Sequence, residues 1–480
     1  MVNASSLGQS WKPDSLELDA GQISVLNGSV APFWLRSQQN GIIDFSGNQA
    51  LMFAELTAEK NLRKHEFRFL ASPHLSLNGN LRFRELQLSY RFRNLGLLIG
   101  KAPTHLEFGN NTLSTGSFGL SHNALPIPGL QVGFMKYTSV PFTRDWVQIR
   151  GWIKHGYFRD ERYTINPLLH EKHGALKIGK PQFSVSTSIY HYAIWNGEHP
   201  EKGLFPRRNR DFWRVFRGKN ADYEYWRSYD FKNEFNALGS HIGNGNILLS
   251  SRLGKHKLHL RFEKVAEDGS GLSKRNRDHK WSVGWSYGTE KRRLELVFET
   301  FKTDVQSGPG IPDSTKVYNF GYLYGGRDDY YNNGNYRNGW THHGTIIGTP
   351  LFMTKAEADE VFTTSINDYD RIIINNRVLG WHGAAKLIWT PKMYFTAQYT
   401  HTKNLGTYAG LNGGRYQWGS RDENWSDSEY PFNEPLIQNY TAIGINYTFV
   451  KATIDIRLAY DFGQMYHTAG ILFKYSHQLF

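Results

Sequence analysis

The chain has 480 residues, of which 56 are Lys or Arg and 43 are Asp or Glu, so its net charge is +13. It contains no Cys, which excludes disulfide scaffolds, thiolate zinc sites and cysteine nucleophiles. No run of about eighteen apolar residues offers a transmembrane helix. Yet 14 Trp, 27 Tyr and 30 Phe accompany a hydrophobic fraction of only 39%. This combination is typical of a transmembrane β-barrel, in which every second strand residue faces lipid.

Alternation of apolar and polar residues is the strongest pattern along the chain. It predicts an all-β, antiparallel fold with long loops and few short helices. The clearest runs cover residues 86–92, 95–99, 258–262, 281–287, 294–298 and 393–399, and then 441–449 and 454–462, which a short connector joins as a hairpin.

A soluble sandwich would show the same alternation. The polar positions here mix charged and small residues, as a wet lumen would, and aromatic residues gather near strand ends, as interface girdles do. The pattern therefore favours an outer-membrane barrel. At roughly 25 residues per strand and connection, the length allows about 18 to 20 strands.

Two segments, 56–64 and 354–364, have the composition of short helices, and Thr354 with Glu357 three residues later forms a capping box. No linker, charge block or low-complexity segment divides the chain. We therefore expect residues 1–480 to form a single barrel domain, in which residues 1–30 form an N-terminal periplasmic or plug-like segment.

Motifs for catalysis are absent from the sequence. It contains no G-x-S-x-G elbow, H-E-x-x-H, P-loop or G-x-G-x-x-G. The run from His170 to His173 does not have the spacing of a zinc protease, and residues 267–271 lack the further carboxylates of a calcium loop. We expect a protein that is not an enzyme and that has no catalytic residue, metal or cofactor.

Two long polar segments, 304–370 and 403–436, are rich in Gly, Asn, Asp, Tyr and Trp. Loops of this length are usually functional, and aromatic rings stack on the apolar faces of sugars. Arginine forks can hold the carboxylate of a uronic acid. The predicted polysaccharide-binding residues are Tyr330, Tyr336, Arg337, Trp340, Arg415, Tyr416, Trp418 and Trp425. In the alternative interpretation, these rings pack against each other and close the barrel mouth.

The charge of +13 requires an anionic partner or environment. An acidic polysaccharide fits, and so do the phosphates of lipopolysaccharide in the outer leaflet of the membrane. The basic residues are scattered and form no nucleic-acid-binding module, so we expect no nucleic acid partner.

Eight segments of the chain, in the same order, resemble the Wzi family of outer-membrane capsule-assembly proteins, in the form common in Bacteroidetes. The segments are 31–43, 99–130, 168–180, 233–243, 267–272, 298–310, 328–350 and 375–383. The resemblance implies an 18-stranded barrel in the bacterial outer membrane. It also implies a lectin-like protein that binds or anchors exported capsular polysaccharide at the cell surface.

One family element is different in this chain. The proteobacterial members carry a Trp-rich W-G-P-G element after a strand that ends in Gly-Arg, whereas this chain has Gly100-Lys101 followed by His105 to Gly109. No sugar-binding residue is therefore carried over from that element.

Two other functions remain open: a porin for sugars or small solutes, and a barrel subunit of a larger assembly with other outer-membrane proteins. An open bore with a single-channel current favours the porin. A bore plugged by inward loops favours the lectin, and stoichiometric co-purification favours the assembly.

Overall fold

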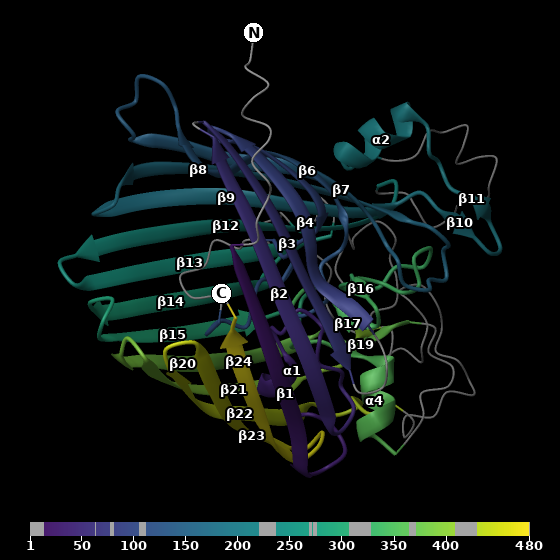
Figure 1. Ribbon diagram of the computed structural model, residues 1–480. Coiled ribbons are helices and arrows are strands. Elements are labelled where there is room, and N and C mark those ends of the chain that lie inside the picture. Colours follow the sequence, from purple (N-terminus) through teal and green to yellow (C-terminus); the bar gives the residue numbers. More distant parts are fainter. Residues whose placement is uncertain are drawn as a thin grey trace.

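The computed structural model describes residues 14–62, 64–76, 81–104, 112–219, 237–267, 271, 276–306, 328–363, 371–408 and 430–479. Eighteen strands pair antiparallel in chain order, and β1 pairs with both β2 and β24, so the sheet closes into a barrel (Figure 1). The predicted fold class, an antiparallel barrel of about 18 strands, is confirmed.

The barrel strands are β1 (Ser15–Asn27), β2 (Gln49–Leu62), β3 (His65–Ser76), β4 (Leu81–Phe92), β5 (Leu95–Lys101), β6 (Gly129–Ser139), β7 (Val147–Tyr157), β8 (Leu168–Lys180), β9 (Phe183–Trp195), β12 (Ser240–Leu253), β13 (His256–Ala266), β14 (His279–Gly288), β15 (Arg293–Lys302), β20 (Val378–Thr390), β21 (Met393–Asn404), β22 (Leu436–Thr448), β23 (Ala452–Gly463) and β24 (Thr468–Gln478).

The connections contain short strands and helices. They are β10 (Glu198–His199), β11 (Gly203–Leu204), β16 (Thr341–His342), β17 (Thr345–Ile346), β18 (Met353–Thr354), β19 (Ile373–Asn375), α1 (Phe33–Arg36), α2 (Asn209–Phe216) and α4 (Lys355–Val361). None of the helices in the described ranges is long and apolar enough to cross a membrane.

The two ends of the barrel differ in the length of their connections. Turns such as 181–182 and 391–392 join strands at one end, which we call the short-turn end. The long connections, among them 102–128, 196–239 and 303–377, begin and end at the other end, which we call the loop end. Because outer-membrane barrels have short periplasmic turns and long extracellular loops, the loop end faces the exterior.

The outer wall has the apolar face that the sequence predicts. In the hairpin of β22 and β23, Ile443 pairs with Leu458 and Ile445 with Ile456. Ile443 is 59% exposed and Leu458 is 44% exposed, while the intervening Ala442 and Ala459 are buried on the lumen side. Exposed apolar residues on a closed barrel form a lipid-facing belt. The predicted hairpin is therefore confirmed, and this protein is an outer-membrane barrel.

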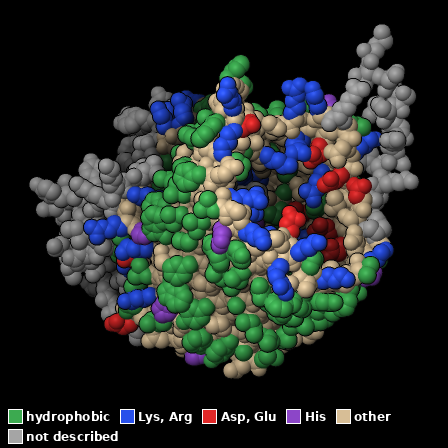
Figure 2. Space-filling model, turned by 90° about the vertical axis from the view of Figure 1, so that its left-hand side faces the viewer, with side chains coloured by type: hydrophobic (Ala, Val, Ile, Leu, Met, Phe, Trp, Pro, Cys, Tyr) green, Lys and Arg blue, Asp and Glu red, His purple; other side chains and the backbone are tan. Residues whose placement is uncertain are grey.

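The lumen side of the wall carries charged residues in pairs. Figure 2 shows the short-turn end, where the molecule is hollowed and Lys, Arg, Asp and Glu side chains line the hollow. Such alternation of a lipid face and a polar lumen is typical of outer-membrane barrels. Ion pairs toward this end include Arg68–Glu59, Arg293–Glu295, Arg457–Asp455 and Lys474–Asp19, with N–O distances of 3.1, 2.5, 3.0 and 3.0 Å.

Of the two predicted helices, one is confirmed and one is wrong. Helix α4 begins after Thr354, whose hydroxyl accepts a hydrogen bond from the Glu357 amide at 3.2 Å, as the capping box predicts. Residues 56–62 belong instead to β2, which pairs with β1 on one side and β3 on the other. The hydrogen-bond ladders of two neighbouring strands outweigh helix propensity, which is a weak prior.

The expectation for residues 1–30 also needs correction. Ser15–Asn27 is the barrel strand β1 rather than a plug-like segment, because its backbone closes the sheet between β2 and β24. Residues 1–13 lie outside the described residues. The segments that fill the bore come from the long connections instead.

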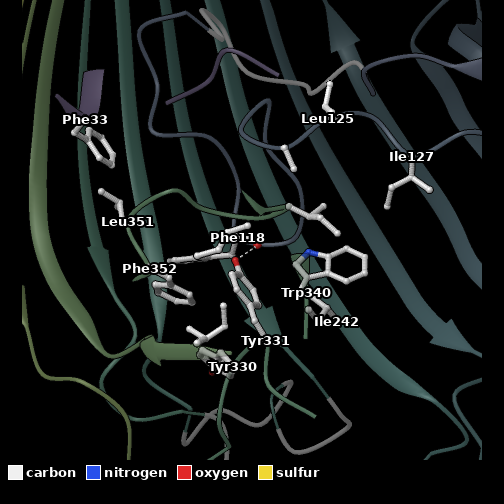
Figure 3. Packing of buried hydrophobic residues seen from close by; sticks show 14 of the residues in the cluster. Phe33, Phe118, Leu125, Ile127, Ile242, Tyr330, Tyr331, Trp340, Leu351 and Phe352 are labelled. Carbon is white, nitrogen blue, oxygen red and sulfur yellow. Dashed lines mark hydrogen bonds between the residues drawn. The ribbon is translucent and has the colours of Figure 1, made fainter. Parts of the chain in front are cut away.

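Inward-folded parts of 28–48, 102–128 and 303–377 fill the bore toward the loop end, and we call them the plug. Figure 3 shows their apolar side chains packed together inside the wall, with Phe118, Tyr331 and Trp340 near the centre. The same buried cluster includes wall residues from strands around the barrel, such as Ile23 of β1 and Tyr192 of β9.

Candidate functional site at the loop end

The plug is fixed to the wall at Glu299 of β15, a buried carboxylate. Its Oε1 accepts a hydrogen bond from the Ser114 hydroxyl at 2.7 Å, and its Oε2 accepts one from the Thr115 amide at 2.8 Å. Lys280 of β14 lies 3.0 Å from the same carboxylate and donates to the Thr115 hydroxyl at 2.6 Å. These charges are paired and hydrogen-bonded, as buried charges need to be.

A second buried carboxylate, Glu263 of β13, holds the next residues of the same segment. It pairs with Arg261 and accepts hydrogen bonds from the Ser117 hydroxyl and, at 3.0 Å, from the Phe118 amide. The alternation in the sequence placed Glu263 and Glu299 on the polar side of their strands. It did not indicate which residues these carboxylates bind.

Helix α1 attaches another part of the plug to the wall at β21, β22 and β23. The Phe33 amide donates to Oδ2 of Asp461 on β23 at 2.7 Å, and the Phe33 ring stacks on Tyr440 of β22 at 4.4 Å between centroids. The indole of Trp34 donates to the hydroxyl of Thr400 on β21 at 3.2 Å. Two connections that are far apart in sequence are therefore attached to adjacent parts of the barrel wall, β13 to β15 and β21 to β23.

The predicted binding residue Trp340 lies in the middle of this plug. It is 2% exposed, and its indole donates to the Gly119 carbonyl at 2.7 Å. The neighbouring Tyr331 donates its hydroxyl to the Phe118 carbonyl (Figure 3). Both hydrogen bonds join segment 303–377 to segment 102–128.

Tyr330 and Tyr336 are buried as well, at 1% and 4% exposure. The Tyr330 hydroxyl donates to Asp278 at 2.8 Å, and the Tyr336 hydroxyl donates to the Asn196 carbonyl at 3.2 Å. With Trp340, these rings contribute to the packing that fills the barrel mouth, which is the alternative role that the sequence left open. Their contact with sugar stays a prediction.

Burial of Asp278 raises its pKa to about 6, although hydrogen bonds from Val305, Tyr330 and Gln306 act in the opposite direction. The group therefore changes charge close to physiological pH. Its carboxylate accepts hydrogen bonds both from Tyr330 and from the Val305 and Gln306 amides of the loop that follows β15.

Arg337 is the accessible member of the predicted set that the structure describes. Its side chain is 34% exposed and lies 3.7 Å from Glu201, with the guanidinium 4.3 Å from the Tyr163 ring centroid. Tyr163 donates to Glu201 at 2.7 Å, and this bond, helped by Arg337, lowers the pKa of Glu201. The Arg337 guanidinium is thus held in place at the rim by the Tyr163 ring and the Glu201 carboxylate.

The other four predicted residues, Arg415, Tyr416, Trp418 and Trp425, lie outside the described residues. The ends of their connection approach the plug, because Tyr408 donates to the Asp304 carbonyl at 2.8 Å and Tyr430 donates to the Ile374 carbonyl at 3.0 Å. The described ends of this connection, 405–408 and 430–435, therefore lie beside the described residues 303–306 and 371–377 at the loop end.

A polar cleft of about 230 Å³ opens beside the plug, between α1, α4 and the turn after β16. Asp44, His343 and Glu360 are exposed at its rim. Burial lowers the pKa of His343, although Asp160 acts in the opposite direction, so the imidazole is neutral at pH 7. A neutral imidazole and two carboxylates can exchange hydrogen bonds with sugar hydroxyls.

Arg36 of α1 lines the inner part of this cleft. One of its terminal nitrogens lies 2.8 Å from Glu357, and its guanidinium lies 4.4 Å from the Phe45 ring centroid. Burial acts to lower the pKa of Arg36, but Glu357 and other neighbours raise it, so the residue stays charged. Its buried Nε has no hydrogen-bond partner among the described residues.

Local sequence patterns did not indicate this cleft. The capping box that predicted α4 contained Glu357, and segment 31–43 contained Arg36, but no local pattern brought the two together. Arg36 and Glu357 lie 321 positions apart in the sequence, and they meet only when both connections fold to the loop end.

No group of three or more His, Cys, Asp or Glu side chains in the described ranges is arranged to hold a metal ion. In the run from His170 to His173, Glu171 pairs with Lys154 at 3.1 Å, and His173 stacks on Trp152 at 4.1 Å between centroids. These contacts give the run a structural role at the beginning of β8.

A second opening lies at the short-turn end. A cavity of about 210 Å³ on the lumen side of β13, β14 and β15 is lined by Lys257, His259, Ser286, Arg293 and Glu295, among others. It reaches Ser114 and Glu299, where the plug is attached. The bore is therefore a charged vestibule on one side of the plug and a polar rim on the other.

Neither a family model nor a curated protein sequence matches this chain. Among solved structures it is similar to Wzi of Escherichia coli, described as a carbohydrate-binding β-barrel involved in group 1 capsule assembly, with a TM-score of 0.57 and 11% identity over 96% of this chain and 83% of that one. This likeness shows the shared barrel fold.

Porins are also similar. OccK5 of Pseudomonas aeruginosa has a TM-score of 0.48 and 10% identity, covering 97% of each chain. A BenF-like porin of Pseudomonas fluorescens Pf-5 has a TM-score of 0.47 and 11% identity, again covering 97% of each chain.

Proposed function

We propose that this protein binds an exported surface polysaccharide, of the capsular type, at the outer face of the outer membrane and retains it there without modifying it. The observation that carries this proposal is the plug. Buried hydrogen bonds and ion pairs attach it to the wall at Glu263, Glu299 and Asp461. Loops fixed in this way provide a rigid surface, which lowers the entropy cost of binding.

The proposed glycan site combines the cleft beside α4 with the rim around Arg337, and it extends to the predicted residues Arg415, Tyr416, Trp418 and Trp425. Carboxylates and imidazole of the cleft would bind hydroxyls, and the arginines would bind acidic groups. Wzi of Escherichia coli, which shares the fold, is described as carbohydrate-binding. We extend that property to this chain as part of the proposal.

Binding of the producer's own capsular polysaccharide to the purified barrel tests the proposal. Because a hydrogen bond contributes about 0.5–1.5 kcal/mol net, the double variant His343→Ala/Glu360→Ala should weaken binding roughly tenfold. Asp359→Ala is the matched control, because this exposed carboxylate lies on the same helix but does not line the cleft. Arg337→Ala and Trp418→Ala test the two remaining parts of the site.

Heat-modifiable migration monitors folding of each variant. Binding that is unchanged in all of them contradicts this location of the site, and absence of binding by the parent contradicts the function. Incubation with the polysaccharide should also leave its chain length unchanged, and reproducible shortening would overturn the non-enzymatic role.

The charged vestibule favours a second candidate, a channel for small solutes. Planar-bilayer recording separates the two, because the plugged barrel should give little or no stable current. A steady single-channel conductance in the parent, together with no glycan binding, would favour the porin.

A further inference from the structure

Helix α2 lies outside the barrel, on the wall at the loop end (Figure 1). Its Phe212 ring lies 5.0 Å from His155 of β7, and its Phe216 ring lies 5.3 Å from His170 of β8. Val215 of the helix is fully buried against Trp195 of β9. The helix therefore packs with its apolar side on the ends of three strands.

The histidines under the helix face away from the lumen. On β8, Glu171 and His173 contact the lumen-facing Lys154 and Trp152, so the intervening Lys172 and the preceding His170 face outward. Outward-facing His155 and His170 are 3.3 Å apart on adjacent strands. Such polar groups are unusual on a lipid-facing wall, and α2 covers them with aromatic rings.

Lys172 also fixes the C-terminal end of the helix. Its ammonium donates to the Phe216 carbonyl and lies 4.4 Å from the Phe216 ring centroid. A cation at the last carbonyls of a helix stabilises it. The position of α2 on the wall is thus set by specific contacts, and the exposed residues Arg210 and Trp213 lie on the other side of the helix.

That other side is basic. Arg210, Arg214 and Arg217 recur at helical spacing on one face, away from the wall-packed Phe212 and Val215. Arg210 and Arg217 are exposed and Arg214 is half-buried. Exposed Arg207, Arg208 and Lys219 flank the stripe, and exposed Trp213 lies beside it.

The position of α2 along the barrel axis indicates which layer of the membrane it contacts. It covers the loop-end termini of β7, β8 and β9, whereas the exposed apolar residues Ile153, Leu176 and Ile189 lie farther along the same strands, toward the short-turn end. A helix just outside the lipid-facing belt, with a Trp beside a cationic stripe, lies at the level of lipid headgroups.

We propose that α2 binds the phosphate groups of an outer-leaflet glycolipid, the phosphorylated diglucosamine of lipopolysaccharide. Guanidinium groups bind phosphate through paired, charge-assisted hydrogen bonds, and several on one face match a headgroup that carries two phosphates. The helix faces sideways from the wall rather than over the mouth, which favours a membrane lipid over a polysaccharide held at the rim. This inference depends on the orientation of the barrel and not on the proposed glycan site.

The test uses the full chain in detergent, with diphosphoryl lipid A in mixed micelles as the probe. The variant Arg210→Ala/Arg214→Ala/Arg217→Ala should bind roughly tenfold to a hundredfold more weakly than the parent. The control Lys255→Ala/Lys291→Ala/Lys392→Ala removes the same charge from exposed lysines at the short-turn end and should bind like the parent. The glycan affinity of both variants should be unchanged.

Further arms identify the ligand. Lipid A without its phosphates should bind the parent roughly tenfold to a hundredfold more weakly than diphosphoryl lipid A does. This comparison uses the parent alone, so it holds even if the arginine variant does not fold. Equal binding of the two lipids overturns the proposal. Displacement of lipid A by inorganic phosphate, or by a uronic-acid polysaccharide, at a comparable concentration of anionic groups would also overturn it.

Discussion

The outer wall and the plug of this barrel are stabilised in different ways. The wall is a regular ladder in which each strand pairs with its neighbours, and its lipid-facing belt consists of apolar residues such as Ile443 and Leu458. The plug depends on a few buried polar contacts between segments that are far apart in sequence, such as Ser114 with Glu299. A change in the wall should therefore affect the whole barrel, and a change in the plug should affect the bore.

The largest effect on the plug is expected for Glu299→Gln. The change leaves Lys280 buried without its charged partner, which costs about 3–5 kcal/mol when a buried pair is broken. Segment 112–118 should detach from the wall, become sensitive to protease and allow current through the bore. In the matched control Lys280→Met/Glu299→Gln the unpaired charge is absent, so much of the stability should return. If Glu299→Gln keeps the protease resistance and the conductance of the parent, this role of the pair is contradicted.

In the wall, Ile456→Arg places a charge on the lipid-facing side near the middle of β23. Such a change costs about 2–4 kcal/mol at mid-bilayer depth. The free energy of unfolding from lipid vesicles, measured in urea, should fall by this amount. Asn446→Arg is the control, because Asn446 lies on the lumen side of the paired strand, opposite Asp455. Equal stability of the parent and Ile456→Arg would mean that this face does not meet lipid.

The plug should also respond to pH through Asp278. Its pKa is raised from 3.8 to about 6, so its contribution to stability is present below about pH 4 and is lost as the pH rises through 6. This difference between the two pKa values corresponds to a change in the free energy of unfolding of at most about 3 kcal/mol. Hydrogen exchange at the Val305 and Gln306 amides, which donate to Asp278, should be slower at pH 4 than at pH 7 after correction for intrinsic rates. The variant Asp278→Asn should lose this dependence, and a parent without it would contradict the assignment.

The smallest effect is expected for Thr354→Ala, which removes the cap of α4. Loss of an N-cap costs about 1 kcal/mol, and here it should act on the helix beside the cleft without changing the stability of the wall. Faster hydrogen exchange at the Glu357 amide, with an unchanged urea midpoint, is the expected result. Asp359→Ala on the same helix keeps the cap and serves as the control. A shifted urea midpoint would show that α4 and the wall unfold together.

The sequence by itself determined the wall. Side-chain alternation is a local property of a strand, so residues 441–449 and 454–462 indicated the hairpin and its lipid face without knowledge of distant partners. The capping box of Thr354 and Glu357 predicted α4 for the same reason. Segment 56–64 was misassigned because its helical composition is also local, whereas its pairing with β1 and β3 is not.

Only the tertiary structure decided the direction of the loops. Nothing near Trp340 in the sequence specifies its partner, Gly119, which lies 221 residues away and is reached when both connections fold into the bore. The same holds for Arg36 with Glu357 in the cleft and for Phe212 with His155 on the outer wall. A segment rich in aromatic and charged residues has the same composition whether its side chains face a ligand, fill a bore or cover a wall. Their role follows from long-range contacts, which local periodicity does not encode.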